Sequence, residues 1–247
     1  MSPHRAGRTF AAAAATALLL AAAPSAMAAS STIGGKIDPV KGKPGTPLKL
    51  SVNFTTEGDP GEKSATLRQV VVQLPPNGVQ NAQFFKTCSA AQINAAKSIK
   101  ACPKGSQVGR GTLKADVPAT DVFGVPGTVT FFNGSRNGKR LTIHVRALRP
   151  VDINHAFDAS LVKTGGRYGY KLTAKIPDIL QEISPGWWAQ VRRFSSTFNA
   201  TTTVRGKKRG YIEAKRCPKA GRVPVAGAFD FTEGASTSAL GWITCKP

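Results

Sequence analysis

The sequence predicts an all-β protein, an antiparallel β-sandwich with one short helical crossover stapled by a disulfide. Short alternating or β-branched apolar segments recur along the chain, and clusters of Gly, Pro, Asn and Asp separate them. Helical periodicity is almost absent outside one stretch, which favours a sandwich. Two tandem immunoglobulin-sized domains, divided near residues 116–127, are the alternative. No low-complexity linker marks that boundary, so we predict a single domain over residues 29–247.

Residues 1–28 have the pattern of a cleaved signal peptide. Arg5 and Arg8 precede an apolar run over residues 10–23, and Ala26-Met27-Ala28 supplies a small-residue cleavage site. The run is shorter than the about 20 apolar residues that a membrane-spanning helix needs. We therefore expect a secreted or wall-associated protein with no transmembrane segment after cleavage.

The first predicted strand lies over residues 48–54, where Leu48, Leu50, Val52 and Phe54 alternate with polar residues. A β-branched run over residues 67–74 predicts the next strand.

The stretch over residues 74–111 then holds the only predicted helix, residues 90–96. Ser89 can cap it, and Pro103 ends any helix near Cys102. A strand that ends near Val117 follows.

The second half of the chain predicts further hairpins. Residues 127–147 form one, with Asn-Gly turn chemistry and with His144 on the polar, exposed side of its second strand. Residues 179–191 are expected to be irregular. Further strands are expected at residues 151–161, 168–176, 194–204, 211–214, 225–232 and 236–244.

Four cysteines in an exported chain predict disulfides. Three pairings are possible, and proximity along the sequence favours Cys88–Cys102 and Cys217–Cys245.

Several motifs together carry a family resemblance. They are the LPP-Gly pattern at residues 74–78, the Cys-Pro blocks at Cys102 and Cys217, the segment FFNG at residues 131–134, and the tail through residues 229–231 to Cys245. The chain resembles a group of secreted, uncharacterised actinobacterial proteins. The resemblance covers most of residues 29–247. It implies an extracellular β-rich fold and carries over no catalytic residue.

Catalytic and metal-binding patterns are incomplete. A G-x-S-x-G elbow is absent, and the S-x-x-K and K-T-G matches at residues 160–165 share Lys163, which cannot fill both roles. A zinc site needs clustered Cys or His, and acidic residues are sparse. We therefore predict a protein that is not an enzyme and uses no cofactor and no metal.

The chain is strongly basic, with a formal net charge of +21 at pH 7. Cleavage after Ala28 would remove two arginines and lower this charge to +19. Such a charge attracts polyanions, although a solvated basic surface without a partner has the same composition.

Two surface patches are candidate binding sites. The first is a basic cluster that could bind polyanions without sequence specificity: Arg205, Lys207, Lys208, Arg209, Lys215 and Arg216. The second is the pair Trp187 and Trp188, which could form an aromatic platform for a sugar.

These features predict a secreted, non-enzymatic protein that binds anionic or glycan polymers of the cell envelope, with no specific nucleic-acid partner. One alternative is a secreted hydrolase or transferase acting on wall polymers, which requires a cleft where His155, Asp158, Asp178 or Glu182 converge. Another is a structural subunit that associates with itself.

Overall fold

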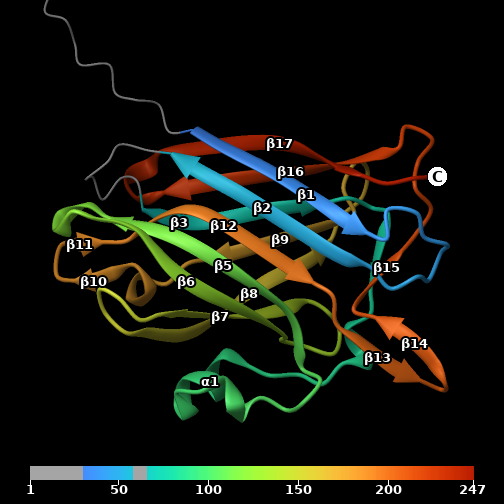
Figure 1. Cartoon of the computed structure of the whole chain (residues 1–247), viewed down its shortest axis with the longest axis horizontal. Helices are drawn as coiled ribbons and strands as arrows, with labels where there is room; N and C mark the ends of the chain where they lie inside the picture. The colour runs from blue at the N-terminus through green and yellow to red at the C-terminus, as the bar shows by residue number, and fades with distance from the viewer. Residues whose placement is uncertain (1–29, 58–65) are drawn as a thin grey trace, which may run out of the picture.

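A computed structural model describes residues 30–57 and 66–247 (Figure 1). The predicted signal peptide lies outside these residues. Eleven strands form one sheet in which every hydrogen-bonded neighbour is antiparallel. In order across the sheet they are β1 (Ser30–Asp38), β2 (Lys49–Glu57), β12 (Gln190–Phe198), β5 (Gln107–Val117), β6 (Val122–Asn133), β7 (Arg140–Ala147), β8 (Ile153–Lys163), β9 (Tyr170–Lys175), β3 (Leu67–Leu74), β16 (Arg222–Phe231) and β17 (Ser236–Thr244).

Shorter elements occupy the connections. Three two-stranded ribbons pair β4 (Gly78–Gln80) with β15 (Ile212–Ala214), β10 (Glu182–Ser184) with β11 (Trp187–Trp188), and β13 (Thr201–Val204) with β14 (Lys207–Gly210). The helical elements are α1 (Ala90–Ala96) and the 3₁₀ turns η2 (Ala82–Phe84), η3 (Ile99–Ala101), η4 (Pro118–Thr120), η5 (Asp178–Leu180) and η6 (Thr232–Gly234). Within the described ranges, no helix has the length and apolar character needed to cross a membrane.

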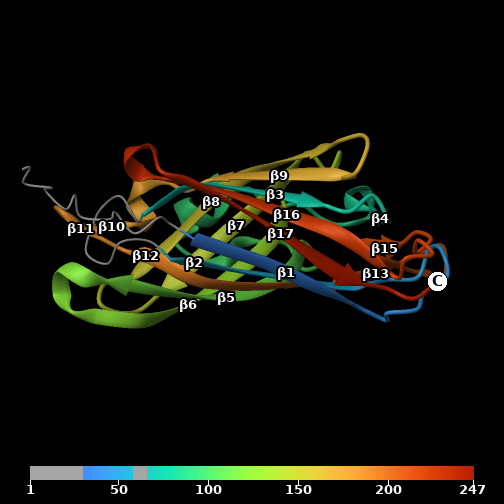
Figure 2. The same cartoon turned by 90° about the horizontal axis from the view of Figure 1, so that it is seen from above.

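The sheet curls until its two edge strands, β1 and β17, lie side by side (Figures 1 and 2). Eleven is an odd number, so strands that alternate in direction bring β1 and β17 together running the same way. Glycines permit the close approach. A Cβ on Gly241 would overlap the carbonyl oxygen of Ile33, and a Cβ on Gly35 would lie 3.0 Å from Ile243. The result is a nearly closed, barrel-like sheet.

This architecture confirms the all-β, antiparallel prediction but not the arrangement in two stacked sheets. Alternate residues point to a shared interior, as Leu50, Val52 and Phe54 do on β2. Those side chains pack on strands near the other edge of the same sheet, including Phe229 of β16, which the curl brings close. A sandwich and a curled sheet both require inward apolar residues to alternate with outward residues along each strand. The sequence pattern therefore could not distinguish the two arrangements.

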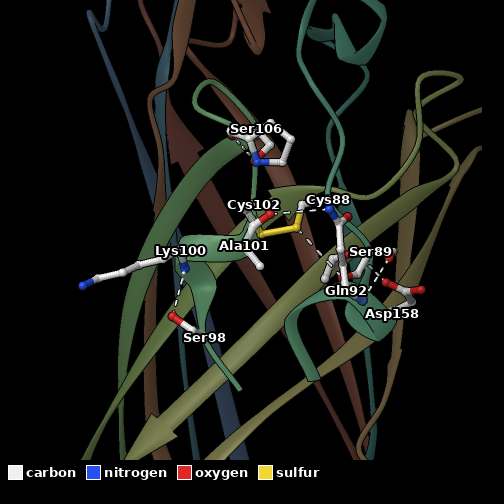
Figure 3. The surroundings of a disulfide bond; sticks show 11 residues. Cys88, Ser89, Gln92, Ser98, Lys100, Ala101, Cys102, Ser106 and Asp158 are labelled. Atoms are coloured by element: carbon white, nitrogen blue, oxygen red, sulfur yellow. Dashed lines mark hydrogen bonds between the residues drawn. A yellow bond between two sulfur atoms is a disulfide. The ribbon is translucent and has the colours of Figure 1, made fainter. Parts of the chain in front are cut away.

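The predicted helix is confirmed as α1, and the Ser89 side chain accepts a hydrogen bond from the backbone N–H of Gln92 at 3.2 Å. The Cys88–Cys102 disulfide closes the loop that contains α1 (Figure 3). The second disulfide joins Cys217 to Cys245. Both bonds are those that sequence proximity favoured.

His144 is buried, with 4% of its surface exposed, although the alternation of β7 predicted exposure. The crossover that contains α1 lies against β7 and β8, and it covers their outer face. Nε2 of His144 lies 2.7 Å from Oδ1 of Asn154, whose amide in turn donates to the carbonyl of Lys97 at 2.8 Å. A long-range contact therefore buries a residue that its local pattern marks as exposed.

The connections leave the sheet at two opposite ends. Residues 39–48, 134–139, 164–169, 199–221 and 245–247 lie at one end, at the right of Figure 1. The crossover of residues 75–106 starts and finishes at this end, but its helix α1 packs on β7 and β8 at the bottom of Figure 1. Residues 118–121, 148–152, 176–189 and 232–235 leave from the other end, where β10 and β11 lie.

Candidate ligand-binding cavity

The interior of the barrel-like sheet holds a cavity of about 260 Å³. Its wall is built mainly from the inward side chains of the alternating strands, so aliphatic and aromatic groups dominate it. Lining residues from six different strands include Phe54, Val72, Leu113, Val129, Ile143 and Leu172. A mainly apolar wall with a few polar groups is typical of sites that bind small apolar molecules.

Most polar groups on the wall have partners. Tyr211 accepts a hydrogen bond from Nε2 of Gln80 at 2.7 Å, and burial raises the pKa of Tyr211 to about 12. Ser196 donates to the carbonyl of Val52 at 3.0 Å. Gln181 differs: its Nε2 donates to Ile176, but its buried Oε1 has no hydrogen-bond partner within the described residues.

The lining of the cavity includes exposed residues at both ends of the sheet, and we call these two places its mouths. Val40, Lys215 and Lys246 line it at the end where the chain terminates, and all three are exposed. Arg149 and Pro150 line it at the opposite end and are also exposed.

Charge is distributed very unevenly between these two ends. At the first end, the five connections other than the crossover of residues 75–106 carry thirteen Lys or Arg residues and one acidic residue, Glu213. At the other end, residues 118–121, 148–152 and 176–189 carry four acidic residues and one basic residue, Arg149. We call these five connections of the first end the basic end. Its field attracts anions.

The predicted polyanion cluster lies at the basic end, where the structure divides it into two parts. Arg205, Lys207 and Lys208 are exposed in the β13–β14 hairpin. Arg209 instead forms an ion pair with the buried carboxylate of Glu213 at 3.0 Å. Glu213 also accepts a hydrogen bond from the N–H of Gly210 at 2.9 Å, so Arg209 contributes to the base of the hairpin.

The rest of the cluster lies beside the cavity. Lys215 and Arg216 precede Cys217, and the disulfide to Cys245 ties their segment to Lys246. Lys215 and Lys246 line the cavity. Lys246 was not among the predicted site residues, because its role depends on a disulfide partner distant in sequence.

The predicted tryptophan platform lies at the opposite end. Trp187 is 45% exposed, whereas Trp188 is half-buried and has interaction partners. Their strand, β11, packs against η4. Other exposed apolar side chains lie at the same end: Phe123 at the start of β6, and Leu148 and Ile179 in connections. Trp187 therefore belongs to a group of exposed apolar side chains at this end of the sheet, which we call the apolar rim.

Three of the four residues of the hydrolase hypothesis have different hydrogen-bond partners. Asp158 accepts from the hydroxyl of Thr142 and lies 3.5 Å from Arg140. Glu182 accepts from the backbone of Gly186, and His155 contacts Asn94 of α1. No hydrogen bond joins any two of these four within the described ranges. The same ranges contain no group of three or more His, Cys, Asp or Glu residues arranged to hold a metal.

The sequence signal for the cavity was present but ambiguous. Inward residues such as Val129, Ile143 and Leu172 all lie within predicted strands, at residues 127–147 and 168–176. A space at the centre appears once eleven strands are wrapped around it, and no single segment encodes that number.

Comparison of the chain with protein-family models gave no match. A comparison with curated proteins gave none either. The resemblance to secreted actinobacterial proteins therefore stays a prediction.

Proposed function

We propose that this protein is a secreted, non-enzymatic binding protein that holds an apolar molecule or chain inside its barrel-like sheet. The observation that carries the proposal is the cavity, which inward side chains of nearly every strand line. Closed sheets of modest strand number commonly enclose one small ligand, because their inward faces converge on a single space.

The cavity volume limits the affinity that apolar burial can supply. A volume of about 260 Å³ accommodates roughly nine ligand heavy atoms at about 30 Å³ each. At about 0.8 kcal/mol for each buried methylene, the gross gain is about 7 kcal/mol. Association itself costs at least about 4 kcal/mol. Apolar contacts alone therefore give weak binding, and polar contacts at a mouth are needed for tight binding.

Binding of octanol, whose size matches the roughly nine heavy atoms that the cavity accommodates, tests this proposal. We expect octanol to bind the oxidised protein saturably in an NMR titration. Ala174 lines the cavity and is buried, so Ala174→Leu should fill part of the space and weaken octanol binding. Ala95→Leu makes the same change on the exposed side of α1 and should leave binding unchanged. Equal binding by both variants, with wild-type circular dichroism, would contradict the proposal.

We also propose that the basic end associates with anionic polymers of the cell envelope. Thirteen cations against one acidic residue, on connections that lie at the same end, favour this second activity. Such binding is electrostatic and salt-sensitive. A secreted hydrolase or transferase has less support, because no hydrogen bond joins any two of the residues that it requires within the described ranges.

A further inference from the structure

The cavity mouth at the basic end carries two lysines with unengaged side chains. Lys215 and Lys246 both line the cavity, and both are exposed. Within the described residues, neither takes part in an ion pair. Two ammonium groups at the opening of an apolar space can meet a ligand that is charged at one end and apolar at the other.

Backbone contacts fix the positions from which these side chains extend. The N–H of Lys215 donates to the carbonyl of Asn77 at 2.8 Å, and the N–H of Lys246 donates to the carbonyl of Val40, also at 2.8 Å. The Cys217–Cys245 disulfide joins the two segments. The mouth therefore has a defined backbone frame, while the lysine side chains extend from it into solvent.

The opposite mouth offers an anion a poorer environment. Arg149 is the cation that lines it, and the connections around it contain Asp121, Asp152, Asp178 and Glu182. At the basic end, the one acidic residue of the connections, Glu213, is buried and paired with Arg209. The electrostatic field therefore distinguishes the two mouths and favours an anion beside Lys215 and Lys246.

We propose that the ligand is an anionic amphiphile, with its apolar chain in the cavity and its carboxylate, phosphate or sulfate group between Lys215 and Lys246. This inference rests on the proposed apolar-ligand function and names the ligand class. It also supplies the polar contacts that tight binding requires, because a cavity of this volume gives only weak apolar binding. Charge-assisted hydrogen bonds from ammonium groups are among the stronger contacts that a protein can make to an anion.

Calorimetric titration with decanoate and decanol tests the inference, because these ligands share a chain and differ in charge at neutral pH. We expect the wild-type protein to bind decanoate at least about tenfold more tightly than decanol. The double variant Lys215→Gln/Lys246→Gln should lose that preference and keep its affinity for decanol. Lys207→Gln/Lys208→Gln removes the same charge from the exposed β13–β14 hairpin, away from the cavity wall, and should retain the preference.

The outcomes separate this inference from the function on which it rests. Equal binding of decanoate and decanol by the wild-type protein would overturn the anionic headgroup site and leave the apolar cavity supported. Equal loss of preference in both double variants would also overturn it, because the general field of the basic end would then suffice. Failure of both ligands to bind would contradict the proposed function itself.

Discussion

The carbonyl oxygen of Ile33 on β1 lies against the Cα of Gly241 on β17, where a Cβ would overlap it. This contact belongs to the seam at which the two edge strands of the sheet meet. Any residue larger than glycine at position 241 must push β1 away, and backbone atoms cannot yield as a flexible side chain can.

Gly241→Ala should therefore destabilise the protein, by about 1–3 kcal/mol of unfolding free energy, as overpacking usually does. Urea unfolding followed by circular dichroism measures the effect. Gly165→Ala is the matched control, because a Cβ there meets no atom within 4 Å. Equal stability of the two variants would show that the seam is loose in solution.

Removal of charge from the β13–β14 hairpin should weaken association with anionic wall polymer. The triple variant Arg205→Gln/Lys207→Gln/Lys208→Gln removes exposed cations without breaking an ion pair. Co-sedimentation with purified wall material should fall for this variant at low salt, and wild-type binding should disappear at high salt. Wild-type binding that persists at high salt would instead favour a neutral glycan, for which Trp187 is the exposed candidate.

Arg209 should behave differently from its hairpin neighbours. Its partner Glu213 is 2% exposed, so Arg209→Gln leaves a buried carboxylate without its ion-pair partner. We expect a clear loss of thermal stability, whereas Lys208→Gln should have almost none. Differential scanning calorimetry compares the two. A lower melting temperature for Lys208→Gln than for Arg209→Gln would refute the assigned roles.

Acidification should destabilise the fold through His155. Burial and the nearby His144 lower the pKa of His155 below its usual 6.5, so the folded state binds its proton less readily than the unfolded state does. The stability that neutral His155 contributes is fully present above about pH 6.5, and it is lost as the pH falls toward the pKa of His155 in the folded state. Melting temperatures measured from about pH 7.5 to 5.5 should fall less steeply for His155→Gln than for the wild-type protein. Equal slopes of melting temperature against pH for the two proteins would rule out His155 as the source of the acid sensitivity.

The two disulfides should differ in their effect on ligand binding. In the chain-entropy description, removing Cys88–Cys102, which spans 14 residues, costs about 3 kcal/mol, and removing Cys217–Cys245, which spans 28, costs about 3.6 kcal/mol. Both double Cys→Ser variants should therefore lose similar stability. Only loss of Cys217–Cys245 should weaken decanoate binding at low temperature, because that bond joins the segments of Lys215 and Lys246. Equal decanoate binding by the two variants would show that the Cys217–Cys245 disulfide does not position Lys215 and Lys246 for the ligand.

Local patterns predicted local structure well. The helix over residues 90–96 and its Ser89 cap are confirmed, because a cap and its helix lie within a few residues of each other. The final strand pair is also confirmed: β16 and β17 occupy residues 222–231 and 236–244. Both disulfide pairings follow from proximity along the chain.

Features that depend on distant contacts were missed. Strand β1 was not predicted, because Gly34 and Gly35 lower the local preference for strand, yet Gly35 allows β1 to approach Ile243. Residues 179–191 were expected to be irregular but contain η5, β10 and β11. The predicted strand over residues 194–204 is divided between β12 and β13. The cavity and its lysine mouth depend on the closure of the whole sheet, which no local pattern specifies.

The uneven placement of charge gives the molecule a permanent electric dipole directed along the axis of its curled sheet. Near a polyanionic surface, this dipole produces a torque that turns the basic end inward within the last Debye length, about 8 Å at physiological salt. The mouth that carries Lys215 and Lys246 would then face the surface, and the apolar rim around Trp187 would face outward. Orientation would thus precede contact, and an amphiphile leaving such a surface would meet the cationic opening first.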